Sequence, residues 1–190
     1  GQAVATTKLT AELATLTEWD LQNDFHHLRT QLAAQRLAMY AADVAGAFVP
    51  LLDPRPATFQ ALASLLDALA APASRQRALL SFQWTVVDEG GFRPELDVDV
   101  QSGDMLGEAT QYRFDAELGG LSSGGTTGWR VRRRTVELLR ALRDGDSLEA
   151  YDTADFERAN RLLCVYCRAI LERELPTMGL ILNQGEERGG

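Results

Sequence analysis

The 190-residue chain is poor in the residues on which most covalent and metal chemistry depends. It contains two cysteines and two histidines, and Lys8 is its only lysine. A Ser–His–Asp or Cys–His triad would have to use His26 or His27 as its base, and nothing in the pattern supports that role. The two histidines are adjacent, so on a helix they point about 100° apart and cannot share a metal ion.

Long apolar runs are also lacking. Each run is broken by Arg, Asp or Gln, so none suits a membrane-spanning helix. Residues 1–10 do not show the basic-then-apolar order of a secretory signal. Two cysteines without an export signal favour a reducing, cytoplasmic environment. Because residue 1 is glycine rather than methionine, we expect the chain to be part of a longer protein.

The overall charge limits the kinds of partner. The net charge is −8, and nearly all of the positive charge is arginine. A chain this acidic is a poor non-specific DNA binder as a whole, because phosphate contacts need local positive charge. A nucleic-acid role must therefore use a local basic patch or a segment outside this chain.

Apolar residues recur at helical spacing over most of the chain, which predicts a mainly α fold. The third predicted helix is apolar on nearly all sides, so we expect it to be central and buried. Residues 1–7 are predicted to be disordered, 8–17 to form a weak strand, and 183–190 to be a disordered tail. The predicted helices are 18–48, capped by Thr17; 58–70; a helix capped by Ser74 that ends near 88; 135–143; and 153–175.

A stretch with strand and turn character interrupts the helices at about 92–128. It reads like a zinc finger whose ligands have been replaced: Asp99 and Ser102 form one pair, and Ser123 and Thr126 the other. Structural zinc needs thiolate or imidazole ligands, so these side chains predict a finger-like insertion without metal. Packing should hold it instead, through Phe92, Leu96, Tyr112, Phe114 and Leu121.

Two short motifs remain open to a functional or a structural interpretation. Cys164 and Cys167 form a C-x-x-C pair, but they lie in the middle of a predicted helix, where no helix dipole lowers a thiol pKa. Packing is therefore the preferred interpretation. The arginines at 130, 132, 133 and 134 follow the insertion; they are either a solvated edge or an anion site for phosphate or an acidic peptide.

Several motifs follow one another in a particular order along the chain. They are Asp24-Phe25-His26-His27-Leu28; Leu79-Leu80-Ser81-Phe82; Pro94-Glu95-Leu96-Asp97, followed by Phe114 and Gly119-Gly120-Leu121; and Arg173-Glu174-Leu175-Pro176-Thr177-Met178. This serial order resembles the C-terminal region of the bacterial RecO family of recombination mediators. The resemblance covers about residues 9–182.

The resemblance implies a helical domain over 18–182 that carries the finger-like insertion. Residues 1–17 would be a tail, or the last strand of a missing N-terminal OB-fold. The family's four zinc cysteines correspond to Asp99, Ser102, Ser123 and Thr126. No cofactor is expected. The family's Arg-Phe-Glu motif on the central helix appears here as Ser81-Phe82-Gln83, so Arg75 or Arg77 would have to supply the basic residue.

The function implied by the resemblance is non-enzymatic: DNA annealing and RecA loading in the RecF pathway of DNA repair. The expected partners are the acidic tail of single-stranded-DNA-binding protein, RecR and DNA. DNA would be bound mainly through the missing domain. No association with a membrane is expected. The protein would be cytoplasmic and nucleoid-associated. Alternatives are a purely structural scaffold and a thiol enzyme using Cys164 or Cys167. The candidate partner or anion site comprises Arg77, Phe82, Arg130, Arg132, Arg133 and Arg134.

Overall fold

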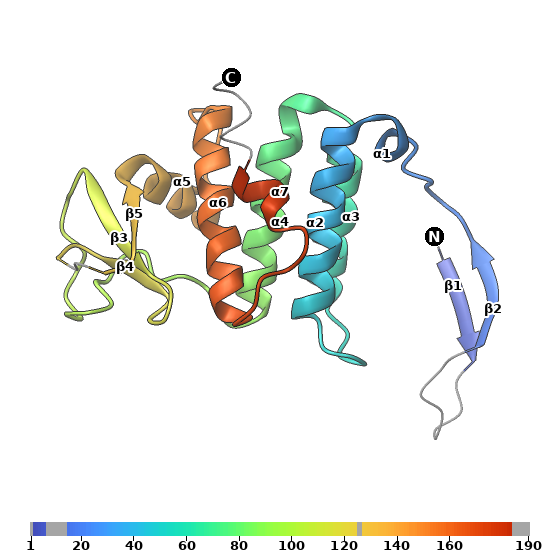
Figure 1. Ribbon diagram of the computed structural model, residues 1–190, viewed down its shortest axis with the longest axis horizontal. Helices are drawn as coiled ribbons and strands as arrows, with labels where there is room; N and C mark the ends of the chain where they lie inside the picture. The colour runs from blue at the N-terminus through green and yellow to red at the C-terminus, as the bar shows by residue number, and fades with distance from the viewer. Residues whose placement is uncertain (1, 7–14, 125–126, 184–190) are drawn as a thin grey trace.

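A computed structural model describes residues 2–6, 15–124 and 127–183. Helices stand side by side in the middle of the molecule, with a small sheet at one end and a β-hairpin at the other (Figure 1). The elements are β1 Gln2–Thr6, β2 Thr15–Asp20, α1 His27–Thr30, α2 Leu32–Phe48, α3 Pro56–Ala68, the short 3-10 helix η1 Pro72–Ser74, α4 Arg75–Glu89, β3 Gln111–Asp115, β4 Gly120–Ser122, β5 Trp129–Arg132, α5 Arg133–Asp144, α6 Thr153–Ile170 and α7 Gly179–Leu182.

The central position predicted for the third helix is confirmed for α4. It packs against α2, α3 and α6, and it contributes to two hydrophobic clusters. Leu79 and Phe82 lie with α2, α3 and α7, whereas Leu80 and Trp84 lie with the sheet, α5 and α6. Because both sides of α4 are covered, the lack of a polar face in its sequence is explained. Within the described residues, no helix is long and apolar enough to cross a membrane.

The small sheet is antiparallel, in the order β4-β3-β5. Four of the five residues predicted to pack the insertion are buried: Leu96, Tyr112, Phe114 and Leu121. The prediction for Phe92 is wrong, because this side chain is 44% exposed. It lies just after α4, where its ring packs edge-to-face with Phe48 rather than in the core of the insertion.

The N-terminal segment differs from the prediction of disorder over 1–7. Residues 2–6 form β1, which pairs antiparallel with β2. The described side chains of the hairpin are exposed, including Val4 at 53% and Trp19 at 62%. A strand partner that lies farther along the chain cannot be read from local composition, so the pairing was missed. Most of the predicted 8–17 strand lies outside the described residues.

The predicted 18–48 helix is wrong over its first part, and the proposed cap Thr17 lies in β2. The side chains of Asn23 and Asp24 accept hydrogen bonds from the backbone N–H groups of Phe25 and His26. Such turns compete with helix formation, and Phe25 has a φ of 45°. The helical spacing of Leu21, Phe25 and Leu28 predicted a shared buried face, but Leu21 is 57% exposed.

Two smaller corrections concern helix ends. α6 ends at Ile170, earlier than predicted, and the chain turns at Glu172, whose φ is 51°. Ser74 makes no N-cap hydrogen bond to α4; its hydroxyl donates to the carbonyls of Ala68 and Ala71 instead. The predicted tail at 183–190 lies outside the described residues except for Asn183.

Candidate anion-binding groove

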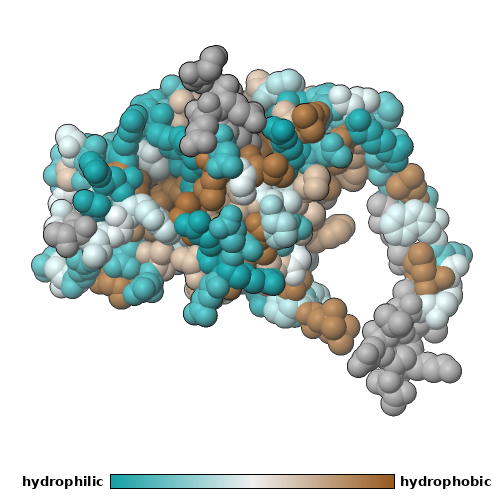
Figure 2. Space-filling view, in the orientation of Figure 1, coloured by the Kyte–Doolittle hydropathy of each residue, from teal (hydrophilic) through white to brown (hydrophobic). Residues whose placement is uncertain are grey.

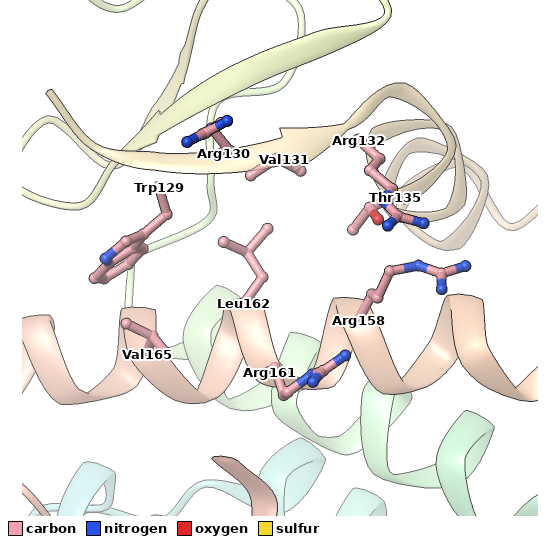
Figure 3. Close-up of a pocket in the computed structure, with 9 residues that line it drawn as sticks. All are labelled: Trp129, Arg130, Val131, Arg132, Thr135, Arg158, Arg161, Leu162 and Val165. Atoms are coloured by element: carbon pink, nitrogen blue, oxygen red, sulfur yellow. The ribbon is translucent and has the colours of Figure 1, made fainter. Parts of the chain in front are cut away.

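A groove of about 230 Å³ separates the sheet from α6. We call it the arginine groove, and Figure 3 shows its lining. One wall comes from β5 and the start of α5, and the other from one stripe of α6. The lining residues are Trp129, Arg130, Val131, Arg132, Thr135, Arg158, Arg161, Leu162 and Val165.

Local periodicity explains why these residues meet. Along β5, the buried Val131 and half-buried Trp129 alternate with the exposed Arg130 and Arg132, as expected for a strand with one face on a core. The α6 residues are spaced i, i+3, i+4 and i+7, which places them on one face of the helix. Figure 3 shows Trp129 directed toward Val165, while Arg130 points away from α6.

One end of the groove is apolar and aromatic. The ring of Trp129 stacks on Phe114 of the neighbouring strand, with centroids 6.3 Å apart and planes 4° apart. Phe114 in turn meets the edge of Tyr166 from α6 at 5.0 Å. This chain of ring contacts holds Trp129 in one orientation at the edge of the sheet.

The other end is cationic. Arg132, Arg158 and Arg161 extend toward it from the two walls, beside Thr135 (Figure 3). Arg158 pairs with the buried Asp155 at 2.5 Å. Within the described residues, Arg132 and Arg161 have no hydrogen-bond or ion-pair partner. Two guanidinium groups are therefore available to an anion without breaking a contact.

The basic run does not act as a unit. Arg133 pairs with Glu137 at 2.7 Å and with Glu108 at 3.3 Å. Arg134 donates to Asp155 at 2.7 Å and to the carbonyl of Ala150, and it lies over the ring of Tyr151. Of the four arginines in the run, the structure brings only two into the groove lining, and it engages Arg133 and Arg134 in internal contacts.

Asp155 links the groove to the start of α6. Burial raises its pKa, but hydrogen bonds from Arg134, the backbone N–H of Asp152 and Arg158 outweigh burial and hold the pKa below its usual range. The same carboxylate completes a capping box with Asp152 at the helix N-terminus. Asp155 therefore stays ionised and fixes the positions of two arginines.

A second groove, of about 460 Å³, lies between α3 and α4; we call it the Phe82 groove. Phe82 forms part of its buried lining, Arg77 is exposed beside it, and the remainder consists mainly of small side chains. Arg75 is absent from this lining, since its guanidinium donates to Gln31 and to the carbonyl of Leu69. The two grooves share no lining residue, so the predicted site residues divide between them.

Asp99 connects two turns of the insertion. One carboxylate oxygen accepts from the backbone N–H groups of Gln101 and Ser102. The other accepts from the N–H of Ser123 at 2.7 Å, the hydroxyl of Ser123 at 2.8 Å and the hydroxyl of Ser122 at 3.3 Å. These donors, led by the N–H of Ser123, hold the pKa of Asp99 well below its usual range although burial opposes ionisation.

The side chains at the predicted former ligand positions do not fit a zinc ion. Asp99, Ser102 and Ser123 supply one carboxylate and two hydroxyl groups, whereas structural zinc takes thiolates and imidazoles. Thr126 lies outside the described residues. Within the described part of the chain, no group of three or more His, Cys, Asp and Glu side chains could hold a metal ion.

Both cysteines lie inside the helical core. Cys164 and Cys167 are fully buried in α6. Burial raises the pKa of Cys164 to about 11 and that of Cys167 further. A thiol without access to solvent and with a raised pKa is a poor nucleophile, so the hypothesis of a thiol enzyme is not supported.

Of the nine residues that line the arginine groove, only Arg130 and Arg132 were predicted from the sequence. The whole α6 wall was missed, although the spacing of its residues Arg158, Arg161, Leu162 and Val165 places them on one face of a helix. Helical spacing predicts that these residues share one face of the helix, but it does not predict which other element packs against that face. The pairing with β5 depends on contacts between distant parts of the chain.

Comparison with known proteins identifies the family. The model of the family "Recombination protein O C terminal" matches residues 29–179. DNA repair protein RecO of Anaeromyxobacter sp. strain K is 33% identical over 115 residues, which cover 60% of this chain and 45% of that protein. For RecO of Halorhodospira halophila the identity is 30% over 165 residues, covering 86% and 66%.

A third relative, DNA repair protein RecO of Symbiobacterium thermophilum, is 28% identical over 182 residues, covering 87% of this chain and 70% of that protein. The matches therefore span from about half to 70% of the length of these relatives. The family match covers most of the helices, the insertion and both grooves. The chain belongs to the family of the recombination protein O C-terminal region, whose named relatives are DNA repair proteins.

Proposed function

We propose that this chain is the helical part of a non-enzymatic recombination mediator and that its Phe82 groove receives the acidic tail of single-stranded-DNA-binding protein. Membership of the RecO family supports the role in DNA repair. The groove between α3 and α4, with Phe82 in its lining and Arg77 at its side, is the observation that carries the choice of site.

The chemistry of the Phe82 groove suits a peptide that ends in an apolar residue and carries carboxylates. Ala61, Leu65, Ala68 and Ala78 give it mostly apolar walls. An apolar side chain inserted there would lose its contact with water, which is the main favourable contribution to such binding. Arg77 has no hydrogen-bond or ion-pair partner among the described residues, so its guanidinium can pair with a carboxylate at the edge.

In this proposal the wider activity belongs to a longer protein. Annealing of DNA strands, loading of RecA and contact with RecR would involve a further, N-terminal domain as well as this chain. The protein would work in the cytoplasm, in association with the nucleoid. The β1–β2 hairpin, which projects from the helices (Figure 1), is the segment we assign to the sheet of that domain.

The insertion is proposed to be a finger frame without metal. The carboxylate of Asp99 joins the turn at Ser102 to the turn at Ser123 by hydrogen bonds. In a zinc finger a metal ion makes the corresponding connection between two ligand pairs. The insertion would then serve as a support that presents β5 to α6.

A purely structural scaffold is the second candidate. It is favoured by one observation: Arg133 and Arg134, from the basic run, form internal ion pairs. A scaffold would hold other domains in position without binding the acidic tail.

A peptide titration separates the two candidates. A fluorescently labelled peptide with the acidic, apolar-ended composition of the tail is titrated with the chain at low and at moderate salt. The proposal predicts saturable binding, weaker at moderate salt, and weaker for Arg77→Gln than for the matched surface variant Arg29→Gln. Absence of binding at both salt concentrations, with the far-UV spectrum of the folded protein, contradicts the proposal and favours the scaffold.

A further inference from the structure

We propose that the arginine groove binds one nucleotide of a single DNA strand, with the base against Trp129 and the phosphate at Arg132, Arg158 and Arg161. This goes beyond the function proposed above, which assigns the acidic tail to the other groove and names no DNA-binding site on this chain. The nucleotide chemistry comes from the groove itself; only the choice of DNA over RNA rests on the proposed role in DNA repair.

The apolar end of the groove offers a preformed surface for a base. The Trp129 ring lies parallel to the ring of Phe114, with planes 4° apart and centroids 6.3 Å apart. Among the strands that the structure describes, β5 pairs with β3 alone and forms an edge of the sheet, so Trp129 lies at the open border of the stack. Every base has a π-face that can stack on such an aromatic ring. Because the Trp129 ring already packs on Phe114, which Tyr166 contacts in turn, we expect little conformational freedom to be lost on binding.

The opposite wall completes this end. Leu162 and Val165 lie across the groove from Trp129 (Figure 3). A planar base can therefore enter between an aromatic ring and aliphatic side chains. This arrangement contacts the base through its faces, so we expect little preference among base identities.

The cationic end is built for a phosphate. Arg132 comes from the β5 wall, whereas Arg158 and Arg161 come from α6 (Figure 3). Thr135 adds a hydroxyl beside them. Guanidinium groups bind phosphate oxygens with pairs of charge-assisted hydrogen bonds. Asp155 fixes Arg158 at 2.5 Å, and it also pairs with Arg134, so the local charge remains positive.

The arginine groove is positively charged, but the protein as a whole is acidic. Figure 2 shows that hydrophilic residues, of whatever charge, cover much of the visible face. With a net charge of −8, the chain as a whole repels phosphate at long range. Binding at this site should therefore be local and should depend on only a few contacts, unlike the broad basic surface of a duplex-binding protein.

Size favours a single strand. A groove of about 230 Å³ is smaller than the usual 300–1,000 Å³ of a ligand pocket, and a base that stays paired and stacked in a duplex cannot enter it. An acidic peptide is the other anionic macromolecule to consider. It would gain less here, because an aliphatic side chain makes no stacking contact with Trp129.

The test compares labelled oligonucleotides by fluorescence anisotropy, using the whole chain. We expect oligo-dT to bind more tightly than a duplex of the same length and more tightly than free dTMP. Because the groove neutralises one phosphate, the slope of log K against log salt should be shallow, about −0.7. Arg161→Gln should weaken oligo-dT binding by at least about fivefold and reduce that slope. Arg29→Gln, which removes one charge at the far end of the molecule, should leave both unchanged.

Abasic oligonucleotides test the stacking surface independently of folding. The natural chain should bind an abasic strand at least about fivefold more weakly than oligo-dT. Trp129→Leu should lose this difference and bind both strands with the same, weaker affinity. An RNA strand of equal length distinguishes general single-strand binding from a preference for DNA.

Four results would overturn the proposal. They are equal binding of duplex and single strand, equal effects of Arg161→Gln and Arg29→Gln, no penalty for an abasic strand, and displacement of oligo-dT by an acidic peptide whose own binding requires Arg161. The tail-peptide titration with Arg77→Gln is unaffected by these outcomes, so failure of either proposal can be recognised separately.

Discussion

The carboxylate of Asp99 accepts hydrogen bonds from both the backbone N–H and the hydroxyl of Ser123, 24 residues later in the chain. Asp99 is buried, with an exposed fraction of 4%. It therefore adds a side-chain connection between two turns of the insertion, beside the backbone hydrogen bond from the N–H of Val100 to the carbonyl of Leu121. Two predictions about stability depend on this carboxylate.

Asp99→Asn should destabilise the fold by about 2 kcal/mol. An amide offers one accepting oxygen instead of two, and its two N–H donors would face the buried N–H and hydroxyl donors that now bond to the carboxylate. Urea unfolding measures the change. Asp104→Asn is the matched control: Asp104 is exposed, and its side chain has no hydrogen-bond partner among the described residues. Equal stabilities of the two variants would contradict a structural role for Asp99.

The same carboxylate gives the protein a specific acid sensitivity. The pKa of Asp99 is lower in the folded state than the usual value of about 4. Its stabilising effect is therefore complete above that value and is lost as the pH falls toward the folded-state pKa. We expect the stability difference between the natural chain and Asp99→Asn to shrink between about pH 5 and pH 2. A difference that stays constant over this range would show that the charge of Asp99 is not responsible.

The two cysteines should react slowly. Both thiols are buried, and burial raises the pKa of Cys164 to about 11, so little thiolate exists at neutral pH. A chromogenic disulfide reagent should modify neither thiol rapidly in the native protein and both in urea. Fast modification of one thiol under native conditions would instead revive the thiol-enzyme hypothesis.

Restoring cysteine at the four proposed ligand positions tests the finger interpretation. The variant with Asp99, Ser102, Ser123 and Thr126 all changed to Cys should bind one Zn²⁺ or Co²⁺ per chain, since two C-x2-C pairs form a tetrahedral thiolate site. The Co²⁺ form should show the absorption bands of thiolate coordination. If the reduced variant binds no more metal than the natural chain, the two turns do not have finger geometry.

The sequence was sufficient for the parts of the fold that depend on local pattern. α4 could be recognised as central because both of its sides are apolar. The predicted end at residue 48 matches the end of α2, and the predicted 58–70 helix lies within two residues of α3 at both ends. The N-terminal hairpin and the break near Asn23 were missed. Both depend on pairing or turn contacts that outweigh the helical spacing of Leu21, Phe25 and Leu28.

The grooves could be predicted only in part, for the same reason. The sequence indicated the arginines after the insertion, but it could not show that Arg134 turns inward to Asp155 while Arg132 remains available. It also could not show that Arg161 of α6 joins Arg132 across the groove. Contacts between separate helices and strands decide which charged side chains pair, and these contacts cannot be read from the residues next to each charge in the sequence.

The most direct test of the account is a titration of two ligands against two variants. Arg77→Gln and Arg161→Gln are each titrated with the acidic tail peptide and with oligo-dT. The account predicts that Arg77→Gln weakens only peptide binding and that Arg161→Gln weakens only oligo-dT binding. Loss of both ligands in one variant, or of neither ligand in both, would contradict the assignment of two separate grooves to two partners.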